Sequence, residues 1–325
     1  MGGLGSADRE GAVAWGKVKG YFFATRPWSF SCSAQPAFLG SLLAFYYLQD
    51  APGFTFNWVT LTLTVVGMVA AQAACNLIND YYDHRWRCDQ PGNSGARNPF
   101  FDRGLSTRGL LTLLAVLMAV DVAIAAYFLA TVGGWLLWLL VLFGGFMVVF
   151  YTAPPVSLKY HALGDLFIIL TNGLAGTFGA FYVQAAGTPF TLRQALSVLL
   201  FSIPVSFMGD VILNANNTRD VSEDRKVKAV SFAGLVGEAG GVALEHFLVF
   251  GSFLVALVLA PIFLTPLTLV ALVTVPMAHR LLHKLRNRAA IDPAAYDRVD
   301  LDGAALNLVF CSLYVGALAV GLTVL

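Results

Sequence analysis

The chain has 325 residues, of which 58% are hydrophobic and only 12% are charged, with a mean hydropathy of +0.71. A soluble domain carries about twice that charged fraction, so the composition excludes an ordinary soluble protein. The apolar runs are continuous and do not alternate, which excludes a lipid-exposed β-barrel. The net charge of +1 gives no reason to expect a nucleic-acid partner, and we expect none.

Apolar stretches of about 20 residues, each long enough to cross a bilayer core of about 30 Å, recur from one end of the chain to the other. They predict nine membrane-spanning helices, at 29–48, 57–81, 109–131, 134–152, 163–183, 194–215, 239–260, 263–282 and 304–324. Residues 1–24 are predicted to form a separate cytoplasmic segment, followed by one transmembrane domain over 25–325. The sequence thus predicts an all-α, polytopic membrane protein in contact with membrane lipids.

The basic residues set the predicted orientation. With a cytoplasmic N-terminus and nine alternating spans, Arg193 is the one residue among the 20 Lys and Arg that falls outside. That bias is what the positive-inside rule predicts for a correct topology. Residues 1–20 contain no apolar core of a cleaved signal peptide. We therefore expect a bacterial cytoplasmic membrane, with a eukaryotic endomembrane as the alternative.

Two polar clusters stand at the predicted cytoplasmic ends of the second and sixth spans. The first cluster is Asn76, Asp80, Asp83 and Asp89, with Asn79 inside it; the second is Asn216, Asp220 and Asp224, with Asn217 and Arg219 inside it. Each begins with the same Asn-x3-Asp step, and the two copies lie 140 positions apart. Polar residues are common at helix ends, but carboxylates at a membrane edge are costly and usually functional. Two matching clusters on one face therefore favour a functional site.

Residues three and four apart share one face of a helix, so each cluster forms a polar stripe. Mg²⁺ prefers oxygen ligands and often combines a few carboxylates with phosphate oxygens and water. Two facing stripes predict Mg²⁺ held against a diphosphate, and the apolar setting indicates a diphosphate attached to a lipid. Basic residues that follow the clusters, among them Arg97 and Lys228, are candidates for neutralising the diphosphate, although each also satisfies the positive-inside rule.

Four segments resemble the UbiA superfamily of intramembrane prenyltransferases. They are TRPWSFSCSAQPAFLG (25–40), NLINDYYDHRWRCD (76–89), YTAPPVSLKYHALGD (151–165) and NNTRDVSED (216–224). The resemblance implies nine helices around a central cavity, with Mg²⁺-dependent diphosphate binding at both clusters. The resemblance also implies a role at the site for Lys159, Tyr160 and Asp165. The alternative interpretations are that Lys159 is a snorkelling lysine and that Asp165 only stabilises the start of a helix.

Within the superfamily, the chain is most similar to the 1,4-dihydroxy-2-naphthoate prenyltransferases of menaquinone synthesis and to vertebrate UbiA-domain proteins. This implies transfer of a polyprenyl chain from its diphosphate to an aromatic acceptor. Relatives often have glycine where Arg87 and Lys228 stand, which leaves open 4-hydroxybenzoate, homogentisate or another phenol as acceptor. A transporter with duplicated polar helices and a lipid-binding scaffold are the alternatives from other classes.

Overall fold

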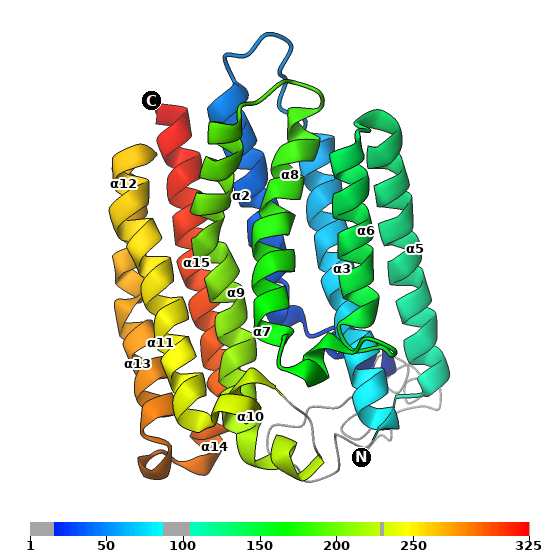
Figure 1. Cartoon of the computed structure of the whole chain (residues 1–325), viewed down its shortest axis with the longest axis vertical. Helices are drawn as coiled ribbons and strands as arrows, with labels where there is room; N and C mark the ends of the chain where they lie inside the picture. The colour runs from blue at the N-terminus through cyan, green and yellow to red at the C-terminus, as the bar shows by residue number, and fades with distance from the viewer. Residues whose placement is uncertain (1–15, 87–104, 228–230, 325) are drawn as a thin grey trace, which may run out of the picture.

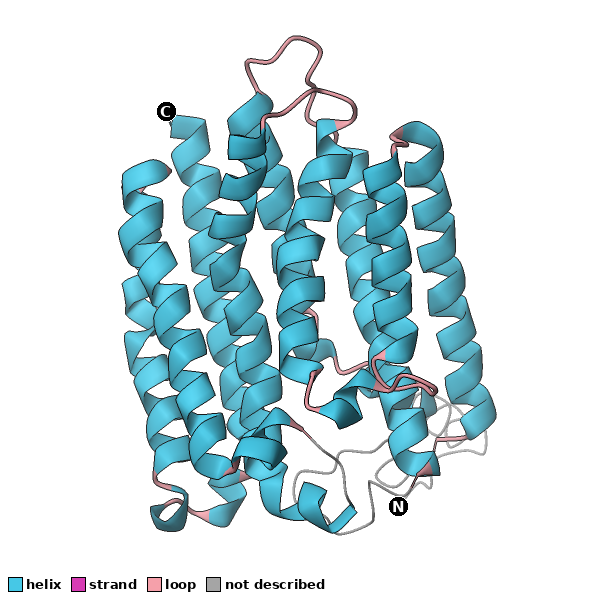
Figure 2. Cartoon of the chain, viewed as in Figure 1, coloured by secondary structure: helices cyan, strands magenta, loops and turns pink. Residues whose placement is uncertain are grey.

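The computed structural model describes residues 16–86, 105–227 and 231–324, without the side chains of 223–227 and 322–324. Every regular element in these ranges is a helix (Figure 2). The long helices run side by side as one bundle, and the described chain begins at the same end where α3 and α9 finish (Figure 1). The predicted all-α class is confirmed.

In the first part of the bundle, the long helices α3 and α5 begin with polar side-chain caps. In chain order the elements are η1 (Pro27–Ser29), α2 (Ser31–Leu48), α3 (Trp58–Arg85), α5 (Thr107–Thr131), α6 (Trp135–Phe150), η2 (Leu158–His161), α7 (Gly164–Ile168), η3 (Ile169–Ala175) and α8 (Gly176–Ala185). The Asn57 side chain accepts from the backbone N–H groups of Val59 and Thr60, and Ser106 accepts from Gly109. These bonds satisfy N–H groups that a helix start leaves without partners.

The second part contains the longest helix. Its elements are α9 (Leu192–Val227), α10 (Phe232–Val236), α11 (Glu238–Leu254), η4 (Val255–Leu259), α12 (Ala260–Phe263), η5 (Pro266–Thr274), α13 (Val275–Arg286), η6 (Arg288–Ala290), α14 (Pro293–Tyr296) and α15 (Val299–Val324). With 36 residues, α9 is about 54 Å long. That exceeds an apolar bilayer core of about 30 Å, so its final turns extend past the apolar region and carry the second polar cluster.

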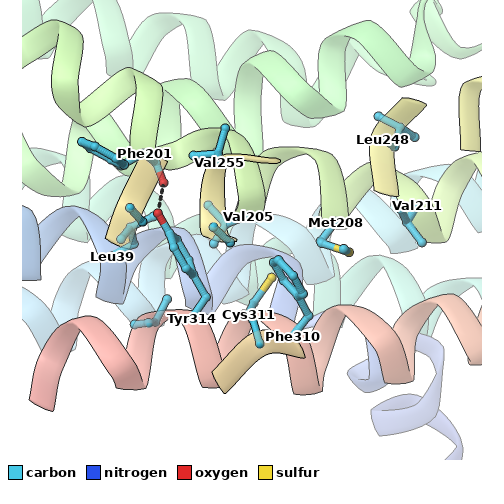
Figure 3. Packing of buried hydrophobic residues seen from close by; sticks show 14 of the residues in the cluster. Leu39, Phe201, Val205, Met208, Val211, Leu248, Val255, Phe310, Cys311 and Tyr314 are labelled. Atoms are coloured by element: carbon cyan, nitrogen blue, oxygen red, sulfur yellow. Dashed lines mark hydrogen bonds between the residues drawn. The ribbon is translucent and has the colours of Figure 1, made fainter. Parts of the chain in front are cut away.

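A solid hydrophobic core joins α2, α8, α9, α11 and α15. Leu39, Met208 and Phe310 are fully buried within it (Figure 3). The hydroxyl of Tyr314 donates to the backbone oxygen of Phe201 at 3.1 Å, so its one polar group is satisfied inside the core. Because side chains fill this part of the bundle, the space for a ligand lies elsewhere, among α3, α5, α6 and α8.

Helices α2 and α8 approach so closely that one position has no room for a side chain. A Cβ on Gly40 would overlap the backbone oxygen of Thr177 and lie 2.9 Å from the backbone nitrogen of Phe181. Small residues at helix contacts permit such approaches in membrane bundles. Gly40 therefore brings α2 close to the wall of the cavity that α8 helps to form.

All nine predicted spans fall on helical segments, but not every one of these segments is long and apolar enough to cross a membrane. Within the described ranges, seven helices are long and apolar enough to cross a membrane, and Trp135–Phe150 is apolar but shorter. The helix Ser31–Leu48 is not among the seven. The count of nine, the cytoplasmic N-terminus and the boundary at residue 24 stay predictions.

Candidate active site

One cavity of about 560 Å³ brings the two polar clusters together. Asn79 and Asp83 of α3 line it, and so do Asn216 and Asp220 of α9. Both helices finish at the same end of the bundle (Figure 1), as expected from the sequence. Apolar side chains of α3, α5, α6 and α8 line the deeper part, among them Leu63, Phe128, Leu137 and Val183. The cavity is thus polar at one end and mainly apolar over the rest of its length.

Asp80 is paired with Arg26, which no local sequence pattern connects with the first cluster. A nitrogen of the Arg26 guanidinium (Nη2) lies 2.5 Å from Oδ1 of Asp80, which is 1% exposed. The Arg26 backbone is left-handed (φ 55°), immediately before the proline that begins η1. Arg26 lines the cavity and Asp80 does not. The guanidinium therefore compensates a buried carboxylate and also borders the ligand space.

Asp83 accepts hydrogen bonds from its own helix, α3, and from η2. Lys159 Nζ lies 2.8 Å from Asp83 Oδ2 and 2.8 Å from Asn79 Oδ1. Asn79 itself donates to Asp83 Oδ2 at 2.8 Å. The hydroxyl of Tyr160 donates to Asp83 Oδ1. Lys159 is therefore a component of the first cluster and not a freely solvated lysine, and η2 supplies two of the three side chains described above as donors to Asp83.

In the second cluster, Arg219 is the central side chain. Its Nε and Nη2 donate to the two carboxylate oxygens of Asp220 at 2.7 and 2.8 Å, and Nη2 also donates to Asn216 Oδ1 at 2.7 Å. Nη1 donates to Asp300 Oδ1 and to the backbone oxygen of Asp297, both at 3.0 Å. Asp300, at the start of α15, also lines the cavity. Sequence reasoning missed Asp300 because nothing in its local pattern connects it with α9.

Asn76 lies one turn deeper than Asp80, and its amide is used within the protein. The nitrogen donates to the backbone oxygen of Thr25 at 2.9 Å and to Ser29 Oγ at 3.2 Å. The amide oxygen accepts from Gln72 Nε2 at 3.3 Å. Asn76 therefore fixes the segment before α2 against α3, while Gln72 and Asn172 continue a polar chain into the cavity.

Asp165 does not line the cavity, although the resemblance places it at the site. It is buried at the start of α7, behind the cavity wall. Asp210 of α9 and Glu245 of α11 are also buried, and Asn214 donates to Glu245 Oε2 at 2.5 Å. The sequence analysis did not single out Asp210 or Glu245, although a lone acidic residue within an apolar helix is a signal that could have identified each of them. Their burial between α7, α9 and α11 makes them part of the packed interior.

Several predicted residues cannot be placed with the others. Asp89, Arg97 and Lys228 lie outside the described residues, and Asp224 falls in α9 among residues whose side chains are not described. Over the described part of the chain, no group of three or more His, Cys, Asp or Glu side chains is assembled for a metal ion. The oxygen donors of Asp83 and Asp220 nevertheless match what Mg²⁺ prefers, provided that phosphate oxygens and water complete its coordination.

Fold and site together define an integral, multi-pass membrane protein with a polar-ended cavity, and sequence comparison gives its family. The UbiA prenyltransferase family matches residues 36–299, and the chain belongs to this family. It is 32% identical to mouse (Mus musculus) UbiA prenyltransferase domain-containing protein 1 over 95% of this chain and 86% of that protein. It is 31% identical to the human (Homo sapiens) protein of the same name over 95% of this chain and 86% of that protein.

Solved structures show the same fold at lower identity. A UbiA homolog from Aeropyrum pernix K1 superimposes with a TM-score of 0.66 at 19% identity, covering 90% of this chain and 97% of that one. A UbiA homolog from Archaeoglobus fulgidus, solved bound to DMAPP and Mg²⁺, gives a TM-score of 0.59 at 14% identity. The superposition covers 94% of this chain and 99% of that one. These similarities establish the helical architecture that surrounds the cavity.

Proposed function

We propose that the chain transfers a prenyl group from an isoprenyl diphosphate to a carbon atom of an aromatic acceptor, with Mg²⁺ bound at the two clusters. The observation that carries the proposal is the cavity itself. Asp83 and Asp220, from separate helices, line its polar end beside Lys159 and Arg219, and an apolar arm extends from that end. A lipid diphosphate has the same division between a charged head and an apolar chain.

Bound Mg²⁺ would neutralise the diphosphate and make it a better leaving group. Asp83 and Asp220 are the described residues that would hold it, and Asn79 and Asn216 offer amide oxygens beside them. The A. fulgidus homolog solved with DMAPP and Mg²⁺ supports this pairing of ligands. Asp89 and Asp224 are proposed to complete the set, as the sequence motifs imply.

The basic residues have a second task when a diphosphate is present. Arg26 and Lys159 now compensate Asp80 and Asp83. With Mg²⁺ held beside them by Asp83, less positive charge would be needed from Arg26 and Lys159, so both side chains would become available to donate to phosphate oxygens. Their own partial exposure, 34% for Arg26 and 27% for Lys159, leaves room for this change of partner. Tyr160 is placed to donate beside them.

Loss of the diphosphate from an allylic carbon leaves a delocalised cation, which the ring of the acceptor attacks. The largely apolar wall of the cavity limits water, which is the competing nucleophile. The ring then loses either a proton or, in a ring acid, its carboxylate as CO₂. With 1,4-dihydroxy-2-naphthoate, the acceptor that the sequence resemblance favours, the product is a demethylmenaquinol.

The test is turnover by the purified protein with Mg²⁺, geranylgeranyl diphosphate and a panel of aromatic acids, read by mass spectrometry. We expect a prenylated, decarboxylated naphthoquinol. Prenylation of 4-hydroxybenzoate, homogentisate or another phenol instead would preserve the chemistry and change the acceptor. An absence of prenylated product and of released diphosphate with every acceptor would reject the proposed function.

A further inference from the structure

A chain of side-chain amides leads from the polar end of the cavity to Asn172. Asn172 Nδ2 donates to Gln72 Oε1 at 2.7 Å, Gln72 Nε2 donates to Asn76 Oδ1 at 3.3 Å, and Asn76 Nδ2 donates to the backbone oxygen of Thr25 at 2.9 Å. Ser33 also donates to Gln72 Oε1, at 3.2 Å. All three amide residues line the cavity.

The direction of this chain is fixed at its far end. A backbone carbonyl oxygen accepts hydrogen bonds and cannot donate them, so Asn76 must turn its NH₂ group toward Thr25. Asn76 then offers its oxygen to Gln72, and Gln72 offers its oxygen to Asn172. If any one amide were flipped, two donor groups or two acceptor groups would face each other and a hydrogen bond would be lost. Asn172 must therefore donate to Gln72, which leaves its amide oxygen for another partner.

The oxygen of Asn172 has no hydrogen-bond donor among the described residues. This oxygen is not enclosed within the protein interior, because Asn172 borders the cavity. Its surroundings on this wall are mainly apolar, with Met68 and Phe167 among the other lining residues. An unpaired acceptor in apolar surroundings is costly, and a ligand donor removes that cost.

The backbone around Asn172 is unusual in a way that holds the side chain in place. It lies within the π-helical segment η3, and π-helical turns inside α-helices occur frequently at functional sites. The next residue, Gly173, packs so closely on α9 that a Cβ there would overlap the side chain of Ser206. This contact and the bond to Gln72 fix Asn172 from two sides.

We propose that Asn172 is a specificity residue whose amide oxygen accepts a hydrogen bond from a phenolic hydroxyl of the aromatic acceptor. Gln72 lies one helical turn deeper than Asn76, about 6 Å along α3, so Asn172 faces the region just below the proposed diphosphate site. The assignment rests on the proposed function. Because the exposed group is an acceptor, it selects a hydroxyl donor and gives no bond to a quinone carbonyl or a methyl ether.

The test compares Asn172→Leu and Asn172→Ala with wild type. For each protein we would measure the KM of the acceptor, the KM of the prenyl diphosphate, and the inhibition constants of 1,4-dihydroxynaphthalene and its dimethyl ether. Wild type is expected to bind the dihydroxy compound about 10- to 100-fold more tightly. Both variants should lose most of that ratio and raise the acceptor KM by a similar factor, with the diphosphate KM unchanged.

Thr171→Val is the matched control. Thr171 lies in the same π-helical segment and lines the same cavity, but its hydroxyl already donates to the Phe167 backbone oxygen at 2.6 Å. It should leave the inhibition ratio unchanged. An unchanged ratio in both Asn172 variants would overturn the assignment, as would a parallel rise of both KM values. If the wild-type protein prenylates no phenol, the proposed function is rejected, and the assignment of Asn172 is rejected with it.

Discussion

Arg219 of α9 and Asp300 of α15 form an ion pair at 3.0 Å, and the Arg219 side chain is 2% exposed. The same guanidinium binds both carboxylate oxygens of Asp220, so one positive charge is shared between two carboxylates. The group of three therefore carries a net negative charge. It leaves Asp220 able to attract a cation, while Arg219 holds its carboxylate in a fixed direction.

Asp300→Asn should weaken the response to Mg²⁺. Without the second carboxylate, Arg219 neutralises Asp220 more completely, so the Mg²⁺ concentration for half-maximal turnover should rise about tenfold. A Mg²⁺ titration of activity measures this. Asp302→Asn is the control, since Asp302 pairs with Lys284 at 2.7 Å and does not line the cavity. Equal Mg²⁺ curves for Asp300→Asn and wild type would contradict the charge argument.

Asp83→Asn and Asp220→Asn should each reduce turnover by at least about 100-fold, because each removes a charged oxygen ligand from the proposed metal sites. Protein that elutes as a single species from detergent size-exclusion chromatography would show that the loss is not a folding defect. Both substitutions preserve side-chain size. Near-normal turnover in both variants would end the two-cluster mechanism.

Removal of Mg²⁺ with a chelator should abolish turnover but leave the thermal unfolding midpoint nearly unchanged. Arg26, Lys159 and Arg219 pair with cluster carboxylates. Because these negative charges have protein partners, we expect the fold not to depend on the ion. Unfolding is followed in detergent before and after chelation, and added Mg²⁺ should restore activity. A large fall in the midpoint would identify a structural metal instead.

Lys159→Met should raise the KM of the prenyl diphosphate about tenfold and leave the acceptor KM near its wild-type value. The variant removes a donor proposed to move from Asp83 to a phosphate oxygen. Lys284→Met is the matched control, because Lys284 also forms an ion pair, with Asp302 at 2.7 Å, but lies away from the cavity. Steady-state kinetics with each substrate varied in turn gives the two KM values. A change confined to the acceptor KM would place Lys159 at the other substrate.

Gly40→Ala should destabilise the protein by about 1–3 kcal/mol, because the added methyl group overlaps the Thr177 backbone and forces α2 away from α8. Gly144→Ala is the control, since a Cβ at that position meets no atom within 4 Å. The comparison uses thermal unfolding of both variants in the same detergent. Equal midpoints would show that the two helices separate without cost.

The sequence by itself determined the helical class and the membrane setting, because continuous apolar runs leave few other folds in a bilayer. It also identified both clusters, since an Asn-x3-Asp step places its members on one helix face. The tertiary structure decided which residues from distant elements face these carboxylates. Arg26 reaches Asp80 through a left-handed turn, and Asp300 meets Arg219 across two helices. Such contacts depend on how helices pack in three dimensions, which no local spacing encodes.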